Sequence, residues 1–334
     1  MQVTIKDVAK EAGVSVGTAS YALNGTGPVS QEKLERVREA AKKLGYVPNG
    51  IAKALQAKQY GVVGYFAYSL AGPFFGQIMR GIEDTFNDAQ EEMIACSCSS
   101  AKKKVTRFLR ERMVDGAIVF GEHIEDSLIE LIAGPNCPVV VMDRELCSQY
   151  ISSVTIGNQE SAYEVGRYIY EQGFRSVGCI IGEGPDGIRR DIGFRAAVRD
   201  FDLELREDWV LKGDFVYDVA QEAVFARLEQ NADFPEVIFA FNDEMAIGAI
   251  NAFTQMGYRI PEDISVIGMD DIPQAAITNP QLTTYHRPIY EHGVKAAELL
   301  LQMLKESVPG TATVLDGYMV ERDSCRKLIH ENEE

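Results

Sequence analysis

Several side chains that could hold a small polar molecule stand where apolar runs of the chain end. Asp143 directly follows the run PVVVM, Asn242 follows VIFAF and Asp270 follows ISVIGM, while Phe74 and Phe75 come shortly after the first such run. In open α/β domains, ligands bind outside the carboxyl ends of parallel strands. Carboxylates and an amide suit vicinal hydroxyl groups, and a phenyl ring suits the C–H face of a sugar. The pattern predicts a ligand-binding cleft for a sugar or sugar derivative, and a nucleoside is the alternative.

The chain after residue 60 contains the elements that would position these side chains. Short apolar runs alternate there with segments of helical pattern. Continuous apolar runs with Gly or Pro at their ends are typical of parallel strands covered on both faces. Helical patterns lie between the runs, which predicts a doubly wound α/β fold, and the number of units predicts two similar lobes. The predicted strands are 62–67, 116–120, 137–142, 177–181, 236–241 and 264–269, and the predicted helices are 76–87, 158–172, 193–201, 219–230 and 243–256.

The first 45 residues have a different character. Thr4 and Asp7 have the spacing of a capping box, Gly13 is placed to end the first helix, and Ser15 is placed to cap a second. Two short helices joined by so few residues predict a helix-turn-helix, and a third helix over 31–44 completes a small core.

The distribution of charge supports a separate role for this segment. The first 60 residues hold nine Lys and Arg against five Asp and Glu, although the whole chain carries a formal net charge of -17. Such asymmetry is typical of a nucleic-acid-binding module attached to a body that DNA repels. A purely structural helical cap on the larger domain is the alternative.

Composition excludes other classes of protein. The sequence has no apolar run near the roughly 18 residues of a membrane span, and residues 1–20 lack a signal-peptide core. The four His residues fall in no nucleophile or metal pattern, and no G-x-S-x-G is present, so we expect neither an enzyme nor a metal site. The six Cys residues form no CxxC pair, which indicates reduced thiols and a cytoplasmic protein. We expect no cofactor. An exported solute-binding protein is the alternative class, but it would need an export signal.

One motif points elsewhere. GEGPDG (182–187) matches the G-x-G-x-x-G of dinucleotide-binding loops and follows a predicted strand. Such a site needs the loop to open directly into a helix. Because Pro185 interrupts the motif, we expect the next helix only near Gly193. NAD binding therefore remains a remote alternative.

The head and body together resemble the LacI (lactose-repressor)/GalR family of bacterial transcriptional regulators over nearly the whole chain. The resemblance implies a periplasmic-binding-protein-like core of two lobes that exchange strands, behind an all-α helix-turn-helix head. It predicts a head over 1–46, a hinge helix over 47–60, one lobe over 61–157 plus 287–316 and the other over 158–286 plus 317–330. The motifs that carry it are TIKDVAKEAGVS, T-x-S-x-x-L-N, LGYVPN, GPFFGQIMRGIE, VDGAIV, GDF, FNDEMAIGAI, IPEDISVIGMDD and PQLTTYHRP.

For the head, the resemblance assigns base reading to Val16, Gly17 and Tyr21. Tyr21 stands where the family commonly has Arg, which can grip guanine through two hydrogen bonds. We therefore expect an operator that differs from the family's usual half-site at the base pair facing Tyr21; packing of Tyr21 on the sugar-phosphate backbone is the alternative. The full predicted DNA-binding set is Thr4, Ser15, Val16, Gly17, Thr18, Ser20, Tyr21, Asn24, Asn49, Ala52, Lys53 and Leu55.

The resemblance also implies that the hinge helix, capped by Asn49, pairs with its dimer mate in the minor groove. Leu55 matches the residue that wedges between base pairs, which bends DNA. A passive linker is the alternative. The expected assembly is a homodimer on near-palindromic double-stranded DNA, because the chain has no long heptad tail that would make a tetramer.

For the body, the resemblance adds Arg190, which matches an R-x-x-G-F arginine, and Phe215, which matches an aromatic platform. The predicted effector site is Phe74, Phe75, Asp143, Arg190, Phe215, Asn242 and Asp270. We expect a repressor controlled by a sugar or sugar derivative, with a nucleoside as the alternative. Some of the polar and aromatic residues near the site have a purely structural alternative: Asp243 and Asp271 could cap helices, and Phe75 could belong to the core. A phosphorylated carrier protein is a further alternative, although Glu298 stands where such regulators carry Arg.

Overall fold

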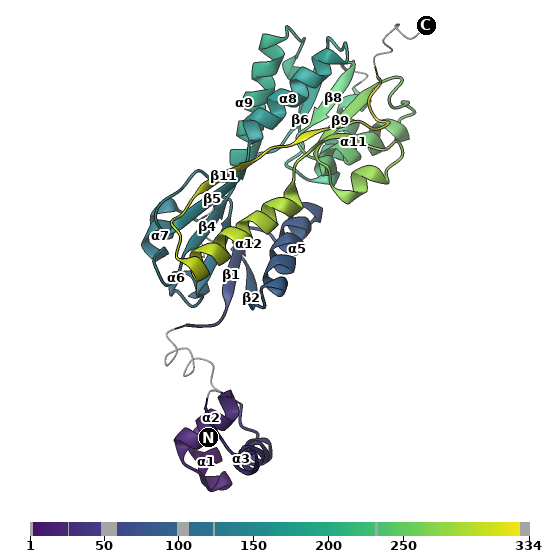
Figure 1. Ribbon diagram of the computed structural model, residues 1–334. Coiled ribbons are helices and arrows are strands. Elements are labelled where there is room, and N and C mark those ends of the chain that lie inside the picture. Colours follow the sequence, from purple (N-terminus) through teal and green to yellow (C-terminus); the bar gives the residue numbers. More distant parts are fainter. Residues whose placement is uncertain are drawn as a thin grey trace, which may run out of the picture. The chain divides into compact units, whose positions relative to one another are not determined.

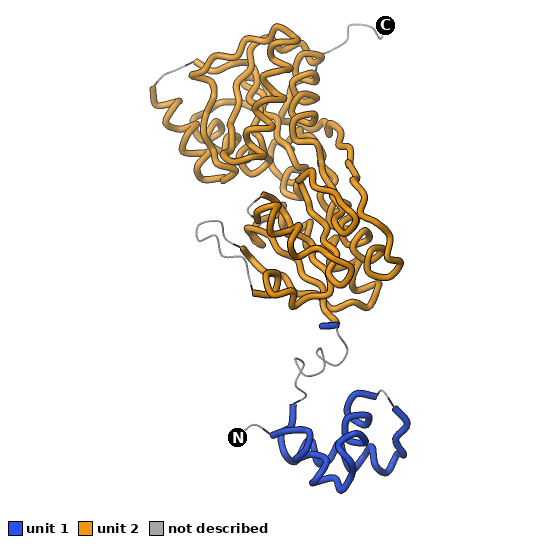
Figure 2. Tube along the Cα trace, turned by 90° about the vertical axis from the view of Figure 1, so that its left-hand side faces the viewer, with its two compact units in different colours: residues 1–60 blue, residues 61–334 orange. Residues whose placement is uncertain are grey.

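The computed structural model describes residues 3–25, 27–47, 59–98, 107–122, 124–230 and 233–327. The chain forms two compact units, residues 1–60 and residues 61–334 (Figure 2). The hinge predictions for Asn49, Ala52, Lys53 and Leu55 lie outside the described residues. None of the described helices is both long and apolar enough to cross a membrane.

The first unit contains three helices: α1 (Ile5–Ala12), α2 (Val16–Asn24) and α3 (Gln31–Leu44). The Asp7 carboxylate accepts hydrogen bonds from the Thr4 backbone N (2.9 Å) and Thr4 Oγ1 (2.7 Å). Gly13 ends α1 with φ 64°. Apolar residues from all three helices form one small core, and the Arg36 guanidinium of α3 donates to the Ala12 carbonyl (2.5 Å) at the end of α1. The three predicted helices are therefore present.

The second unit contains two six-stranded sheets in two lobes (Figure 1). Every strand pair is parallel except β10 with β12. The strand order in the first sheet is β11 (Ala312–Leu315), β5 (Ile151–Ile156), β4 (Val139–Met142), β3 (Gly116–Phe120), β1 (Val63–Ala67) and β2 (Met93–Ser97). The strand order in the second sheet is β12 (Tyr318–Val320), β10 (Thr283–His286), β9 (Ser265–Asp270), β8 (Val237–Ala240), β6 (Val177–Ile181) and β7 (Val210–Lys212). The predicted α/β class with two lobes is confirmed.

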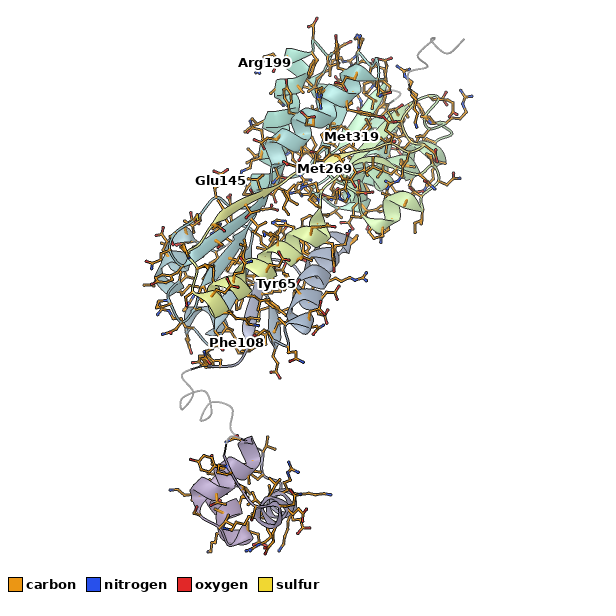
Figure 3. All side chains as sticks on the ribbon, viewed as in Figure 1. Tyr65, Phe108, Glu145, Arg199, Met269 and Met319 are labelled. Carbon is orange, nitrogen blue, oxygen red and sulfur yellow. The ribbon has the colours of Figure 1, made fainter. Side chains whose placement is uncertain are left out.

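Helices cover both faces of the first sheet. Tyr65 of β1 is buried with α5 (Pro73–Asp88) and α12 (Ile289–Glu306), whereas the neighbouring Phe66 packs on the other side with α6 (Arg107–Arg110) and α7 (Asp126–Ile132). The second sheet packs with α8 (Asn158–Glu171), α9 (Gly184–Asp200), α10 (Tyr217–Glu229) and α11 (Asp243–Gln255), and Met269 lies in its core (Figure 3). Burial on both faces explains the continuous apolar runs.

The chain passes between the lobes three times. It crosses from β5 to α8, returns from β10 to α12, and crosses again from β11 to β12. The C-terminal strands therefore join different sheets, and α12 packs on the first lobe although the preceding β10 belongs to the second. The exact lobe boundaries stay a prediction.

The start of α9 corrects the sequence analysis. This helix begins at Gly184 within the Gly-rich motif and not near Gly193. Pro185 lies in its first turn, where a missing N–H breaks no helical hydrogen bond and the fixed φ suits the helix. Two glycines of the motif serve close packing, because a Cβ at Gly187 would overlap the Gly182 carbonyl and a Cβ at Gly182 would overlap the Phe215 ring. The third, Gly184, has φ 83° and open space around it.

Helices α5 and α12 approach each other at a glycine, which gives a stability prediction. A Cβ at Gly81 would overlap the Tyr290 carbonyl oxygen and lie 2.9 Å from the Val294 nitrogen, whereas a Cβ at Gly76 of the same helix would meet nothing within 4 Å. We expect Gly81→Ala to lower the free energy of unfolding by about 1–3 kcal/mol through overpacking. The matched Gly76→Ala should be neutral or stabilise by up to about 1 kcal/mol. Thermal unfolding of the three proteins checks this, and equal melting temperatures would contradict it.

Candidate functional site

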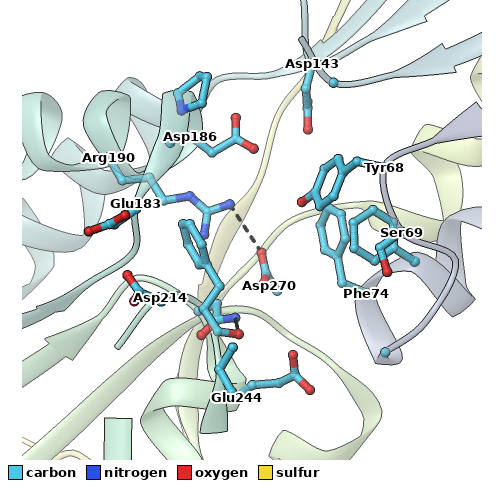
Figure 4. A pocket seen from close by; sticks show the side chains of 18 of the residues that line it. Tyr68, Ser69, Phe74, Asp143, Glu183, Asp186, Arg190, Asp214, Glu244 and Asp270 are labelled. Atoms are coloured by element: carbon cyan, nitrogen blue, oxygen red, sulfur yellow. Dashed lines mark hydrogen bonds and ion pairs between the residues drawn. The ribbon is translucent and has the colours of Figure 1, made fainter. Parts of the chain in front are cut away.

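A cavity of about 710 Å³ lies where the carboxyl ends of strands from both lobes face each other (Figure 4). We call it the cleft. Its described lining residues are Tyr68, Ser69, Ala71, Gly72, Phe74, Phe75, Gly121, Glu122, Asp143, Glu183, Gly184, Pro185, Asp186, Arg190, Asp214, Phe215, Val216, Asn242, Glu244 and Asp270.

The structure brings all seven predicted effector residues to this cleft. Phe74 and Phe75 begin α5, Asp143 follows β4, Arg190 lies on α9, Phe215 follows β7, Asn242 caps α11, and Asp270 ends β9. Phe75 is only 9% exposed and packs edge-on against Phe74, with ring centroids 5.2 Å apart, so it largely supports the wall. That these residues bind an effector stays a prediction.

A buried network of charged side chains beneath the cleft connects the two lobes. Arg287, which is 1% exposed, stands in the β10–α12 crossover. Its Nη1 donates to Asp270 Oδ1 (3.3 Å), and its Nη2 lies 3.7 Å from Asp143 Oδ2. Arg287 therefore contacts a carboxylate from each lobe.

Arg190 is held by the second lobe. Its Nε donates to Asn158 Oδ1 (2.8 Å), its Nη1 donates to the Phe241 carbonyl, and its Nη2 lies 3.7 Å from Asp270 Oδ1. The guanidinium carbon also lies 5.5 Å from the centre of the Phe215 ring. Burial raises the pKa of Asp270, while Arg190 and Arg287 act in the opposite direction by favouring its charged form. The network thus fixes the positions of Arg190, Asp270 and Phe215 before any ligand arrives.

Unusual backbone conformations gather at the cleft. Asp143, Asp214, Phe215 and Asp270 all have positive φ, with values of 52°, 50°, 61° and 118°. Non-glycine residues adopt such angles at a cost, and they cluster at binding sites where the surrounding structure enforces them. Here the angles turn each side chain at the end of its strand toward the cavity.

Sequence reasoning missed part of the lining. Tyr68 directly follows β1, so the rule that selected Asp143 would also have found it. Glu244 directly follows Asn242 and Asp243 in the first turn of α11, and Asp214 stands beside Phe215. By contrast, Glu122 and Asp186 come from loops and helix starts whose position only the tertiary structure shows.

Asp243 and Asp271 do not cap helices, which corrects that interpretation. Asn242 caps α11 by accepting a hydrogen bond from Met245 N (2.9 Å). Asp243 is fully buried and accepts from Thr284 Oγ1 (2.5 Å) and Ile272 N (2.8 Å). Asp271 pairs with Arg322 (2.6 Å) and His286 (3.0 Å). Asp243 joins α11 to β10 and to the loop after β9, and Asp271 joins that loop to β10 and to Arg322, all within the second lobe.

In the head, the predicted base-reading side chains lie on the exposed face of α2. Val16 is 43% exposed and Tyr21 49% exposed, and the Tyr21 ring packs against Gly27. Ser15 Oγ accepts from Thr18 N (3.1 Å) and Asn24 Nδ2 donates to Ser20 Oγ (3.2 Å), so these polar groups stabilise the helix itself. The exposed surface of α2 therefore presents few hydrogen-bonding groups besides the Tyr21 hydroxyl.

Comparison with known proteins decides the family. Residues 4–49 match the model of bacterial regulatory proteins of the lacI family, and residues 167–325 match a periplasmic binding protein-like domain. The chain is 33% identical over 309 residues to the HTH-type transcriptional repressor PurR of Aliivibrio salmonicida (strain LFI1238), covering 91% of this chain and 92% of the relative. This chain belongs to the lacI family. As a lacI-family member it is a DNA-binding transcriptional regulator, and the PurR relative is named a transcriptional repressor.

Solved structures of the lacI family have the same fold. The transcriptional regulator CelR–cellobiose complex is similar with a TM-score of 0.68 and 27% identity, covering 97% of this chain and 100% of that one. A LacI family transcriptional regulator from Enterococcus faecium with bound ribose is similar with a TM-score of 0.69 and 26% identity, covering 80% of this chain and 99% of that one.

The buried Asp243 gives a pH prediction. Burial raises the pKa of Asp243 in the folded protein from 3.8 to about 8. Between these values the folded state holds a proton that the unfolded chain releases, so this group's contribution to the free energy of unfolding falls as pH rises. Asp243→Asn does not titrate: its amide oxygen can accept from Ile272 N, and its amide nitrogen can donate to Thr284 Oγ1. We expect its stability relative to the unsubstituted protein to rise between pH 5 and pH 8, as measured by urea unfolding.

The control is Asp263→Asn. Ion pairing with Arg259 lowers the pKa of Asp263 to about 2, so this group stays charged over the same range. Parallel stability curves for Asp243→Asn and the unsubstituted protein would contradict the prediction.

Proposed function

We propose that this lacI-family protein represses transcription as a homodimer on near-palindromic DNA, and that a sugar or sugar derivative in the cleft changes its affinity for that DNA. The main support is the make-up of the cleft: aromatic walls from Phe74 and Phe215 stand opposite carboxylate and amide groups at strand ends. Rings match the C–H faces of a sugar and the polar groups match its hydroxyls. The relatives with cellobiose and with ribose bind such molecules themselves.

A second candidate effector is a purine or nucleoside. The relatives named PurR favour it, and a phenyl ring such as Phe215 also stacks on a base. We rank it second because the cleft carries several carboxylates at hydrogen-bonding positions, which suit the many hydroxyl donors of a sugar.

The proposed mechanism is linkage between two sites. A ligand that contacts residues from both lobes favours one arrangement of the lobes over another. The position of Arg287 supports this linkage. Arg287 stands in the β10–α12 crossover between the lobes and pairs with Asp270, which lines the cleft, and with Asp143 of the other lobe. Residues 47–60 then pass the change to the head. Coupling of this kind is typically about 1–3 kcal/mol and works in both directions.

Operator binding with and without sugars tests the proposal. The full chain should bind an inverted repeat found by selection, with affinity that falls steeply as salt rises. A matching sugar should change that affinity by about 5- to 150-fold. Phe215→Ala and Asp270→Asn should keep DNA binding and lose the response to the sugar, as measured by fluorescence anisotropy. Leu131→Ala, on the exposed face of α7, is the matched control and should behave like the unsubstituted protein.

If no sugar and only nucleosides or purine bases alter DNA binding, the second candidate is correct. If no small molecule of either class does so, the proposed effector control is wrong.

The exposed face of α2 gives a separate prediction about the operator. Tyr21 offers one hydroxyl and a ring, so the half-site should differ from the family's usual one at the base pair that it faces. Tyr21→Arg should restore preference for guanine there, because Arg can donate two hydrogen bonds to its O6 and N7. Selection from random DNA with both proteins measures this. Recovery of the same half-site by both would show that Tyr21 contacts only the backbone.

A further inference from the structure

The turn between α2 and α3 contains a glycine that its own backbone conformation does not require. The φ angle of Gly27 lies outside the positive range that residues other than glycine rarely adopt. Gly27 precedes Pro28, and a residue before proline favours extended backbone, which alanine also adopts. By contrast, Gly25 in the same turn ends α2 in the left-handed conformation, with φ 68°. The reason for glycine at position 27 therefore lies in what surrounds it.

The ring of Tyr21 occupies the space that a side chain at position 27 would need. A Cβ on Gly27 would lie 2.7 Å from Tyr21 Cγ, 2.8 Å from Cδ1 and 3.0 Å from Cδ2. Carbon atoms in contact stand about 3.5–4.0 Å apart, so the overlap would be severe. Because the three distances are nearly equal, the Cβ would lie over the face of the ring, at the end nearest the helix. The Tyr21 ring therefore packs with its face against the Gly27 backbone.

A small movement of the ring would not relieve this overlap. Cγ is the first atom of the ring, so it keeps its place when the ring turns about χ2, and a change of χ1 is needed to move it away. The χ1 angle has a few staggered values, and a change from one to another carries the whole ring and its hydroxyl to a different place. Tyr21 is exposed and is not part of the small core of the head, so this movement is open to it.

The neighbouring position on α2 gives the ring no comparable support. Gly17 lies four residues before Tyr21, which places it on the same face of the helix. A Cβ on Gly17 would meet only Ser15 Oγ within 4 Å, so the Tyr21 ring leans toward the turn and not toward residue 17. No hydrogen bond joins the Tyr21 hydroxyl to the part of the chain that the structure describes. Packing on Gly27 therefore decides where an otherwise available hydroxyl points.

We propose that Gly27 is a positioning residue for operator recognition. The missing side chain at position 27 lets the Tyr21 ring lie on the turn, and this placement of the ring determines which base pair is preferred opposite Tyr21. Gly27 itself reads no base. The inference rests on the proposed function, because it needs Tyr21 to contact a base pair of the operator. It adds a residue outside the second helix to those that determine sequence preference.

A purely structural role for Gly27 predicts a different result. If Gly27 served only to close the turn, a side chain there would disturb the head as a whole. Binding to every DNA sequence would then weaken alike, because contacts to phosphate and sugar carry no sequence information directly. A change confined to one base pair therefore separates positioning of Tyr21 from general disturbance of the fold.

Substitutions at both positions of the full chain test the proposal. Selection from random DNA gives the operator, and fluorescence anisotropy then measures the affinity for operators changed at each base pair in turn. The unsubstituted protein is compared with Gly27→Ala, Tyr21→Ala and the double variant. One hydrogen bond from the Tyr21 hydroxyl contributes about 2- to 13-fold in affinity. We expect Gly27→Ala to reduce the preference by about fivefold at the base pair where Tyr21→Ala acts, with affinity for unrelated DNA kept within about twofold.

The double variant shows whether Gly27 acts through Tyr21. Residues in contact have effects that do not add, whereas independent residues have additive effects. In the Tyr21→Ala background the ring is absent, so Gly27→Ala should change the preference at each base pair by less than about twofold.

Gly25→Ala is the matched control, because it adds the same methyl group to the same turn. A Cβ on Gly25 meets nothing within 4 Å, but the left-handed backbone there is strained by any side chain. We expect this variant to bind all sequences more weakly and to keep the preference at each base pair within about twofold.

The outcomes separate this inference from the proposed function. An unchanged preference in Gly27→Ala overturns the positioning role and leaves base reading by Tyr21 intact, provided that Tyr21→Ala alters the preference. A loss that is equally large in the Tyr21→Ala background also overturns it, because residue 27 then acts without Tyr21. If Tyr21→Ala leaves every preference unchanged, Tyr21 reads no base, and the operator prediction and this inference are both wrong. A selection that yields no inverted repeat overturns the proposed function itself.

Discussion

A buried guanidinium between two carboxylates is the interaction on which the arrangement of the cleft depends. Arg287 stands in a crossover between the lobes and contacts Asp143 of one and Asp270 of the other. Removing one partner of a buried ion pair typically costs about 3–5 kcal/mol, since the other charge is left without compensation. The pair therefore ties together two strand ends that belong to different lobes. A ligand that competes for Asp270 acts directly on this connection.

The strand topology explains why residues from distant parts of the chain meet in the cleft. Parallel strands bring their carboxyl ends to one edge of each sheet, and the two edges face each other across the cleft. The chain passes three times between the lobes, and residues 61–334 form one compact unit. The binding residues and the crossover that holds Arg287 thus belong to one continuous network.

The two units differ in their charge. The head carries the excess of basic residues and a small, well-capped core, while the body carries the acids. Acids on the body keep DNA contacts confined to the head. The cleft is lined mainly by acids as well, and Arg189, Arg287 and Lys212 lie close to several of them.

Much of this protein could be predicted from its sequence because the relevant signals are local. Capping by Thr4 and Ser15 follows from spacing, and six continuously apolar strands follow from burial on both faces. Six strands escaped prediction. The residues of β2, β7, β11 and β12 are only partly buried or exposed, and β5 and β10 are largely buried but have Ser and Thr among their apolar residues. From the sequence, Pro185 predicts that no helix begins within the Gly-rich motif. In the structure Pro185 lies in the first turn of α9, where proline is compatible with the helix.

The sequence by itself determined that Asp143, Asn242 and Asp270 stand at strand ends and that Phe74 and Phe75 follow the first strand. The resemblance to the family added Arg190 and Phe215, and all seven residues line the cleft. Only the tertiary structure decided which charges are compensated. Arg189 pairs with Glu122 from 67 residues away and Arg287 pairs with Asp143 across the lobes, while Glu244 and Asp214 find no partner among the described residues. Pairing depends on distances of a few ångströms between segments far apart in the chain, and residue types and spacing along the sequence carry no such information.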